Sequence, residues 1–163
     1  MKLAAVLLGI LDNKLILTKR AANLRSFTGH ICLPGGKFDD SDESVVATAM
    51  REFQEEVYFD GVITPSFCML PEYSIVSGHA VYPIVAQLDG KISGVNIAEV
   101  DKLIYLDLDE LRTKQFTIHP NYPLIKHNRC FTHNGELVWG LTAHILFTYT
   151  QNYINNFRRD IYD

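Results

Sequence analysis

The residues of this chain most able to do chemistry are three closely spaced glutamates, Glu52, Glu55 and Glu56. Apolar residues recur around them at the spacing of one helical face: Val46, Ala49, Met50, Phe53 and Val57. Each helical residue turns the chain by about 100°, so the three carboxylates share the opposite face, Glu52 and Glu56 only about 40° apart. Magnesium prefers such oxygen ligands and completes its shell with water and phosphate oxygens. The spacing therefore indicates a site for a divalent metal ion and a diphosphate.

A solvated acidic surface is the alternative interpretation of such a helix. Like charges three and four residues apart repel by about 0.2–0.5 kcal/mol, so interspersed lysines would be expected. None occurs between Lys37 and Lys91, and a bound cation would remove the repulsion. Arg51 stands one turn before Glu55, and we expect the two to form an ion pair. A turn at residues 34–36, Pro-Gly-Gly, leads toward the helix and leaves room for close backbone approach.

The residues around the glutamates resemble the sequence box of the Nudix hydrolases. That box reads Gly, five residues, Glu, seven residues, Arg-Glu, an aliphatic residue, any residue, Glu-Glu, any residue, Gly and an aliphatic residue. The chain supplies most of it, at Gly36, Glu43, Arg51, Glu52, Phe53, Glu55, Glu56 and Phe59.

Two positions depart from the box. Six residues instead of five separate Gly36 from Glu43, so counting forward from the glycine reaches Asp42. Tyr58 replaces the second glycine, and the left-handed conformation that ends many helices is costly for tyrosine. We therefore expect the helix to end differently, with residues 60–61, Asp-Gly, as the candidate end.

An upstream pattern resembles the signature of the coenzyme A diphosphatase branch of the same family. The signature reads Leu-Leu-Thr, any residue, Arg, Ser or Ala, three residues, Arg, three residues, Gly, three residues, Phe-Pro-Gly-Gly. The chain departs from it only at Ile16 and Leu33, both apolar replacements. That branch also commonly carries the extra residue between glycine and arginine. The matching residues are Leu17, Thr18, Arg20, Ala21, Arg25, Gly29, Pro34, Gly35 and Gly36.

The resemblance implies a metal-dependent hydrolase in which water attacks one phosphorus of a diphosphate. Coenzyme A or a derivative would be cut into 3',5'-ADP and 4'-phosphopantetheine. Glu52, Glu55 and Glu56 would hold one to three Mg²⁺ or Mn²⁺ ions. Arginines offer paired donors to phosphates that the metal leaves unneutralised, although each arginine taken singly reads as a surface residue. The expected substrate-binding residues are Arg20, Arg25, Gly35, Gly36 and Lys37.

The general base varies within the family, and a box glutamate or a carboxylate from a later loop can take the role. Glu99 is the leading candidate outside the box because it precedes a predicted strand, with an ordinary surface glutamate as the alternative. The expected catalytic residues are thus Arg51, Glu55 and Glu99. Near the helix start, Asp39, Asp42 and Glu43 are expected to serve capping and the helix dipole.

Two other functions remain open at this point. One is a Nudix hydrolase of another nucleoside diphosphate derivative, such as ADP-ribose or a damaged nucleotide. The other is a non-catalytic Nudix module that binds a nucleotide, which the complete carboxylate set disfavours.

Whole-chain properties fit one small enzyme domain over residues 1–163 that acts on a small nucleotide. The chain is 47% hydrophobic, and its net charge of -4 without a basic block argues against nucleic acid as a partner. Three widely spaced cysteines indicate reduced, mostly buried thiols of a cytoplasmic protein. The apolar run at residues 3–11 is too short to cross a membrane and is read as the first core strand. Edge strands and an aromatic final helix permit a homodimer without requiring one.

The remaining pattern predicts the elements that would position the site. Strands are expected at residues 3–11, 14–18, 61–70, 80–88 and 102–106, a helical turn at 109–112, a hairpin at 130–138 and a closing helix at 141–157. Pro71 and Pro83 are expected to mark breaks or sheet edges. The resemblance implies the α/β fold class: a Nudix-type α/β/α sandwich with a mixed sheet and a catalytic loop-helix-loop.

Overall fold

The computed structural model of the chain describes residues 2–23 and 29–154. They belong to two compact units, Met1–Tyr105 and Leu106–Asp163. The expectation that residues 1–163 act as one domain stays a prediction. Within the described ranges, none of the helices combines the length and the apolar character needed to cross a lipid bilayer.

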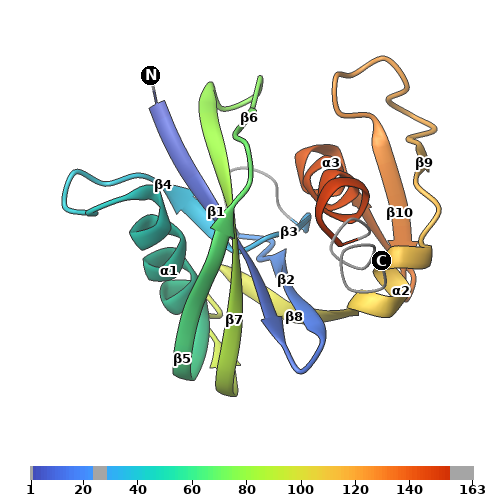
Figure 1. The fold of residues 1–163 in the computed structure, drawn as a ribbon. Coiled ribbons are helices and arrows are strands. Elements are labelled where there is room, and N and C mark those ends of the chain that lie inside the picture. The colour runs from blue at the N-terminus through green and yellow to red at the C-terminus, as the bar shows by residue number, and fades with distance from the viewer. Residues whose placement is uncertain (1, 24–28, 155–163) are drawn as a thin grey trace, which may run out of the picture. The chain divides into compact units, whose positions relative to one another are not determined.

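A mixed sheet forms the first unit (Figure 1). Its main path runs β3–β2–β1–β7–β5, with β4 beside β1, β6 beside β7 and β8 beside β2. β1 and β7 pair in parallel over their shared length, whereas β1–β2, β1–β4 and β5–β7 pair antiparallel. The strands are β1 (Lys2–Leu11), β2 (Lys14–Arg20), β3 (Ile31–Cys32), β4 (Gly35–Lys37), β5 (Val57–Cys68), β6 (Glu72–Tyr73), β7 (His79–Val95) and β8 (Val100–Asp107).

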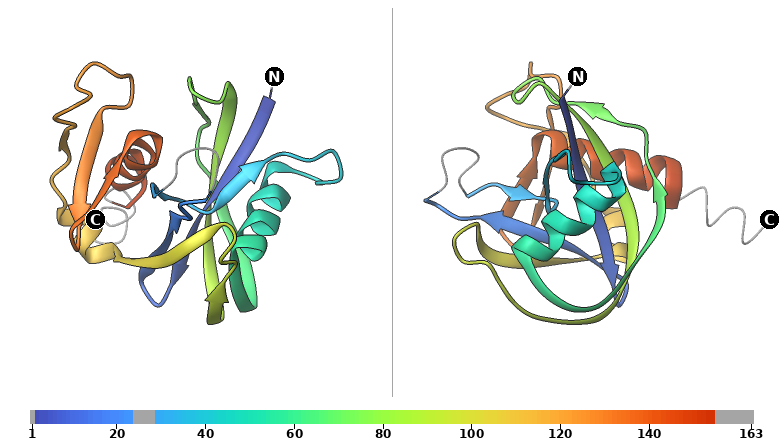
Figure 2. Two further views of the ribbon diagram at one scale, coloured as in Figure 1. Left: turned by 180° about the vertical axis from the view of Figure 1, so that it is seen from behind. Right: turned by 90° about the vertical axis from the view of Figure 1, so that its left-hand side faces the viewer.

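The predicted helix is confirmed as α1 (Val45–Glu56), which lies along the sheet beside β1, β5 and β7 (Figures 1 and 2). Its apolar face is fully buried at Ala49 and Phe53, and the Phe53 ring meets Phe59 edge to face at 5.9 Å between centroids. Burying a phenylalanine side chain contributes about 1.5–3 kcal/mol, so this face fixes the helix on the sheet. Glu55 is exposed and Glu52 is intermediate, whereas Glu56 is buried. The expectation that all three carboxylates share the face opposite the core is therefore wrong for Glu56, which lies only about 60° from Phe53 around the helix.

Both ends of α1 are defined by specific backbone partners. Ser44 is the N-cap, and its hydroxyl accepts from the N–H of Ala47 at 3.1 Å. The predicted end at residues 60–61 is wrong, because the helix stops at Glu56 and β5 begins at the next residue. The Glu56 carbonyl accepts from the N–H of Asn96 at 3.0 Å, so the residue that follows β7 supplies a donor at the helix end where a glycine turn is absent. The predicted loop-helix-loop is therefore a loop followed by a helix and a strand.

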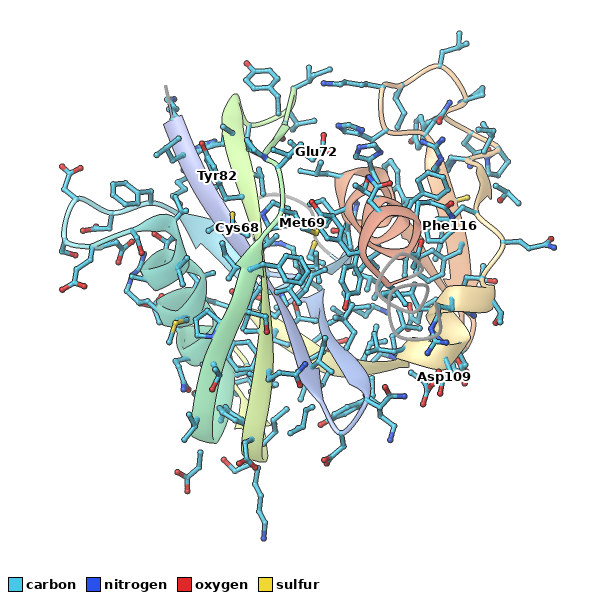
Figure 3. The ribbon with its side chains drawn as sticks, in the orientation of Figure 1. Cys68, Met69, Glu72, Tyr82, Asp109 and Phe116 are labelled. Atoms are coloured by element: carbon cyan, nitrogen blue, oxygen red, sulfur yellow. The ribbon has the colours of Figure 1, made fainter. Side chains whose placement is uncertain are left out.

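The two prolines behave differently. Pro71 lies in the break between β5 and β6, as predicted, while Pro83 lies inside the central strand β7. The Pro83 carbonyl accepts from the Met69 N–H at 2.8 Å, so this edge of the residue faces the break between β5 and β6. In a strand the nitrogen of a residue points to the same side as its carbonyl, so the Pro83 nitrogen also faces the break, where no strand needs a donor. Figure 3 labels Met69 and Cys68 at this point. Cys130 is buried, Cys32 is intermediate and Cys68 is exposed, so the expectation of mostly buried thiols is met fully by Cys130 alone among the three.

The N-terminal hairpin is confirmed by the positive φ angles of its turn residues, 51° at Asp12 and 63° at Asn13. The predicted strand at 80–88 continues to Val95, because β7 keeps its pairing with β5 through Gly90. Glycine opposes glycine there, Gly61 against Gly90, which lets the two backbones pass closely.

The second unit contains a three-stranded sheet and a helix. Its elements are α2 (Leu108–Thr113), β9 (Thr117–Ile118), β10 (Arg129–His133), β11 (Glu136–Trp139), α3 (Gly140–Tyr149) and a π-helical turn, Thr150–Ile154. The β10–β11 hairpin turns at Asn134 and Gly135, as predicted. The closing helix is shorter than predicted, and residues 155–157 lie outside the described ranges. Phe116, labelled in Figure 3, packs edge to face against Phe131 and Phe147.

Candidate active site

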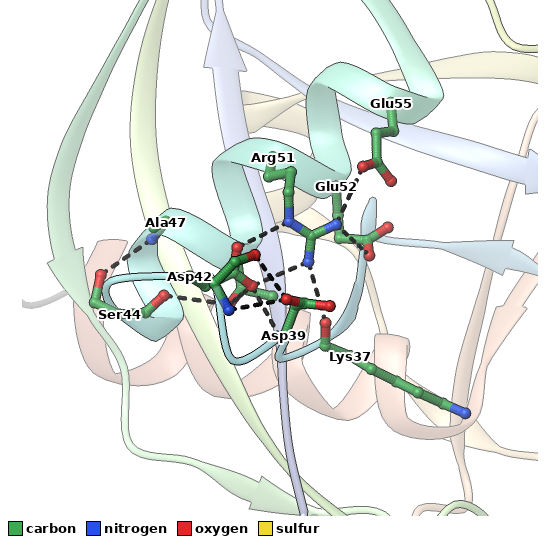
Figure 4. Close-up of polar contacts among 10 residues, drawn as sticks. Lys37, Asp39, Asp42, Ser44, Ala47, Arg51, Glu52 and Glu55 are labelled. Atoms are coloured by element: carbon green, nitrogen blue, oxygen red, sulfur yellow. Dashed lines mark hydrogen bonds and ion pairs between the residues drawn. The ribbon is translucent and has the colours of Figure 1, made fainter.

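Arg51 is the centre of a hydrogen-bonded network at the front of α1 (Figure 4). Its Nε donates to Asp42 Oδ1 at 2.9 Å and its Nη2 to Asp42 Oδ2 at 3.0 Å, a bidentate pair. Nη2 also donates to the Lys37 carbonyl at 3.3 Å. The guanidinium thus joins the loop before the helix to the helix itself and is fixed in one orientation.

Asp42 is the acidic residue that fixes Arg51, and Glu43 is exposed. The Thr48 hydroxyl donates to Asp42 Oδ2 at 2.8 Å and the Asp39 N–H donates to the same oxygen at 3.0 Å. The hydrogen bond from Arg51 is the main cause that holds the pKa of Asp42 well below its usual range. Capping belongs to Ser44 instead, so the expectation that Asp42 acts at the helix cap is corrected. The spacing in the sequence contained the signal for this assignment, because counting five residues forward from Gly36 reaches Asp42.

The remaining donor of Arg51 serves two of the predicted metal ligands. Nη1 lies 3.1 Å from Glu52 Oε1 and 3.1 Å from Glu55 Oε1. The predicted pair between Arg51 and Glu55 is therefore confirmed. The Glu55 side chain is 52% exposed and its carboxylate is directed toward the guanidinium (Figure 4).

Glu56 is buried, with 7% of its surface exposed, at the last position of α1. Its Oε2 accepts from the N–H of Gly35 at 2.9 Å. Burial, followed by the charges of Glu52 and Glu99, raises the pKa of Glu56 to about 8 against the lowering effect of the Gly35 hydrogen bond. Burial and the neighbouring Glu55 likewise raise the pKa of Glu52. Carboxylates crowded in this way attract a cation.

The paired glycines form the short strand β4 beside β1, where a turn was predicted. A Cβ at Gly35 would overlap the carbonyl of Ala5, and one at Gly36 would overlap the Glu52 carboxyl group. The expected close approach is thus present, and its cause is pairing with β1 on one side and the helix on the other. Only glycine leaves room for the Glu52 carboxylate in this position.

A pocket of about 150 Å³ brings the separate parts together. It is lined by Arg20 from the end of β2, Gly35 from β4, Glu52 and Glu56 from α1, and Glu99 from the turn before β8. The Ala21 N–H donates to the Glu99 carbonyl at 3.0 Å, which ties that turn to the end of β2. The predicted residues Arg20 and Glu99 therefore lie beside the box glutamates.

Four of the described residues predicted for the site are not among those that line this pocket: Gly36, Lys37, Arg51 and Glu55. Glu55 is outside it and pairs with Arg51. The Lys37 side chain extends away from the network, which uses its carbonyl instead (Figure 4). Arg25 lies outside the described residues.

A divalent metal ion fits the chemistry of the pocket. Glu52, Glu56 and Glu99 supply carboxylate oxygens, and the pKa of Glu56 is raised first by burial and then by the charges of the other two carboxylates. In residues 2–23 and 29–154, no three acidic, histidine or cysteine side chains are close enough together to coordinate a metal ion by themselves. Magnesium does not need one, because it keeps water and takes substrate phosphate oxygens beside one or two carboxylates.

Comparisons with known proteins agree with this geometry. The NUDIX domain family matches residues 1–127. A protein of Pectobacterium atrosepticum named "Uncharacterized Nudix hydrolase NudL" is 35% identical over 154 residues, covering 88% of this chain and 78% of that protein. A protein of the same name from Photorhabdus laumondii is 34% identical over 160 residues, covering 91% of this chain and 83% of that protein.

Solved structures show the same fold. A NUDIX hydrolase from Nitrosomonas europaea superposes with a TM-score of 0.55 at 22% identity, covering 67% of this chain and 58% of that one. The MutT protein from Methanosarcina mazei gives a TM-score of 0.53 at 23% identity, covering 68% of this chain and 79% of that one. The predicted fold class, a Nudix-type α/β fold with a mixed sheet, is confirmed.

Proposed function

The chain belongs to the Nudix family of hydrolases, and on that premise we propose that it cleaves the diphosphate of coenzyme A or of a coenzyme A derivative. The products are 3',5'-ADP and 4'-phosphopantetheine. One observation carries the proposal: Arg20 of the upstream signature and Glu52 and Glu56 of the Nudix box line one pocket. The two sequence patterns are therefore parts of one site, as a shared substrate requires.

Glu52 and Glu56 would hold a Mg²⁺ or Mn²⁺ ion in this pocket. Bound there, the ion supplies neutralisation of diphosphate oxygens and lowers the pKa of water. Glu55 would keep its predicted role as a ligand if its half-exposed carboxylate rotated away from Arg51.

Arg51 acts in this proposal as a positioning residue. Its guanidinium is engaged by Asp42, Glu52, Glu55 and the Lys37 carbonyl, so it holds the carboxylates at fixed places instead of touching the substrate. Carboxylates fixed before substrate arrives need no reorganisation during the reaction. Misplacing them by about 1 Å typically costs about a hundredfold in rate.

Glu99 is the proposed general base. It lines the pocket beside Glu56 and comes from a separate segment, so it can face the diphosphate from another direction. A carboxylate in that place accepts the proton of the attacking water. Arg20 donates to the phosphate oxygens, and Arg25 is proposed for the same role from the signature alone.

The decisive experiment compares coenzyme A, ADP-ribose and 8-oxo-dGTP in magnesium buffer, with products identified by mass. Release of 4'-phosphopantetheine at the highest kcat/KM is the expected result. Activity confined to the other two substrates would refute the coenzyme A assignment and leave a Nudix diphosphatase. Binding without cleavage of any of the three, in Mg²⁺ and in Mn²⁺, would refute the enzymatic assignment.

Two variants separate the parts of the proposal. Glu56→Gln keeps the size of the side chain and the acceptor for Gly35, and it is expected to abolish cleavage of every substrate. Arg20→Ala is expected to raise KM most for the substrate that the signature selects. Asp89→Asn, a change at an exposed residue of β7 that does not line the pocket, is the control and should leave both constants unchanged.

A further inference from the structure

A β-bulge stands opposite Arg20 at the end of β2. The Gly29 N–H donates to the Arg20 carbonyl at 3.1 Å, and the Arg20 N–H donates to the His30 carbonyl at 2.9 Å. Two residues of one segment thus oppose a single residue of the other, the arrangement of a bulge that begins with glycine. Gly29 has φ of 72°, the left-handed conformation that this bulge requires. No described atom lies within 4 Å of a Cβ added there, so backbone conformation alone demands the glycine.

The bulge makes His30 the cross-strand neighbour of Arg20. Regular pairing precedes it, Thr18 with Cys32 and Lys19 with Ile31. Side chains of directly opposed residues project to the same face of a sheet. The pKa of His30 is consistent with a position close to Arg20, because burial and then the positive charge of Arg20 lower it. At neutral pH the imidazole is therefore uncharged and carries one N–H donor beside the guanidinium.

The charges around the pocket define what Arg20 faces; His30 stands beside Arg20 and is not itself among the residues that line the pocket. Of the described residues that line the pocket, Arg20 is the one with a positive charge, against Glu52, Glu56 and Glu99. A diphosphate brings at least two further negative charges. A metal ion held by the glutamates would compensate the charge of the substrate oxygens that face α1. The oxygens that face β2 need donors from that strand and its neighbour.

We propose that His30 is a substrate-binding residue, and that its ring N–H and the Arg20 guanidinium bind the same phosphate group of a diphosphate substrate. Gly29 is then a positioning residue, since its left-handed conformation forms the bulge that sets His30 beside Arg20. The inference rests on the proposed diphosphatase function and deepens it. It also supplies a physical reason for a glycine at this place in the upstream signature.

A double-mutant cycle tests the proposal. Kinetics of His30→Ala, Arg20→Ala and the double variant are measured at saturating Mg²⁺ on whichever substrate the panel shows to be cleaved. A hydrogen bond to a charged group is worth about tenfold or more in affinity, so His30→Ala should raise KM about tenfold with kcat within about threefold. The double variant should lose less than the product of the single losses, because both residues bind one phosphate.

Two further variants separate binding from structure. His30→Gln keeps an N–H donor and should recover part of the lost affinity. Lys19→Ala changes the preceding residue of β2, whose side chain projects to the opposite face, and should leave KM unchanged. Thermal unfolding of each variant shows whether the fold is retained. A KM that stays within twofold in His30→Ala, or losses that multiply in the double variant, would overturn the proposal.

Direct binding keeps this test apart from the test of function. Inorganic diphosphate with Mg²⁺ is titrated into the wild type and into His30→Ala by calorimetry. Weaker binding to the variant supports the subsite even if none of the chosen nucleotides is cleaved. Equal binding refutes it even if coenzyme A proves to be the substrate.

Discussion

Glu56→Gln should remove the loss of stability that the metal-free protein suffers as Glu56 ionises with rising pH. Burial raises the pKa of Glu56 from 4.5 to about 8 in the folded state. Each pH unit between the two values changes the free energy of unfolding by about 1.4 kcal/mol. The interval of about 3.5 pH units therefore sets an upper limit of about 5 kcal/mol on the change in the free energy of unfolding. Effective dielectric constants in proteins are high, which reduces the cost of burying a charge, so we expect a change between about 2 kcal/mol and this limit.

The sign follows from where the proton is held. Between pH 4.5 and about 8, folded Glu56 keeps a proton that the unfolded chain has released. The contribution is fully present below pH 4.5 and is lost as pH rises through 8, so wild-type stability falls across this range. Glutamine resembles the protonated form and does not titrate. The variant should match the wild type near pH 5 and exceed it at pH 9.

Urea unfolding in EDTA at pH 5, 7 and 9 measures the difference directly. Adding Mg²⁺ at pH 9 should stabilise the wild type more than the variant, since a ligand that binds only the folded state adds stability by mass action. Glu55→Gln is the matched control, because that carboxylate is half exposed, and its curve should follow the wild type. A Glu56→Gln protein less stable than wild type at pH 9 without metal would refute the reasoning.

Three other perturbations probe the network around α1. Asp42→Asn removes the charge that holds Arg51 and should reduce kcat/KM about 10- to 100-fold, as loss of residues that orient metal ligands usually does, measured by steady-state kinetics. Gly36→Ala places a methyl group against the Glu52 carboxyl group and should reduce activity at least about tenfold. Chelation by EDTA should abolish hydrolysis, and added Mg²⁺ or Mn²⁺ should restore it, followed by product release.

Each of these has an internal comparison. Glu43→Gln, at the exposed neighbour of Asp42, should change kcat/KM less than twofold; an effect as large as that of Asp42→Asn would reverse the assignment of the box carboxylate. A Cβ at Gly94 would meet its nearest neighbour at an ordinary 3.6 Å, so Gly94→Ala should be tolerated. Full activity of Gly36→Ala would show that Glu52 is free to move. Hydrolysis that continues in EDTA would contradict a metal requirement.

Much of the fold was predictable because local patterns and tertiary structure agree. The apolar spacing around Phe53 indicates α1, and the turn residues at 12–13 and 134–135 locate two hairpins. The errors arose where a neighbouring segment supplies what local chemistry lacks. Pro83 is accommodated inside β7 because its nitrogen faces the break between β5 and β6, and no local pattern contains that break.

The site was predicted by residue type more fully than by geometry. Glu52, Glu56, Glu99 and Arg20 lie around one pocket, and the spacing of the glutamates on a helix contains part of that information. The partner of Arg51 depended on a one-residue difference in loop length, which sequence counting left open between Asp42 and Glu43. The bulge at Gly29 is defined by two backbone hydrogen bonds, so the glycine of the upstream signature marks its position without predicting which residues pair.

The direct junction between α1 and β5 makes the molecule unequally tolerant of changes in chain length. The segment between β4 and α1, residues 38–44, can accommodate an extra residue, because Asp42 is fastened to the helix by its own side chain. An extra residue cannot be accommodated after Glu56 in this way, because the next residue already pairs with Val95 in the sheet. One residue inserted there would rotate the helix by about 100° relative to β5 and turn the carboxylates out of the pocket. Length variation among natural or engineered versions of this enzyme should therefore accumulate before the helix and be absent after it.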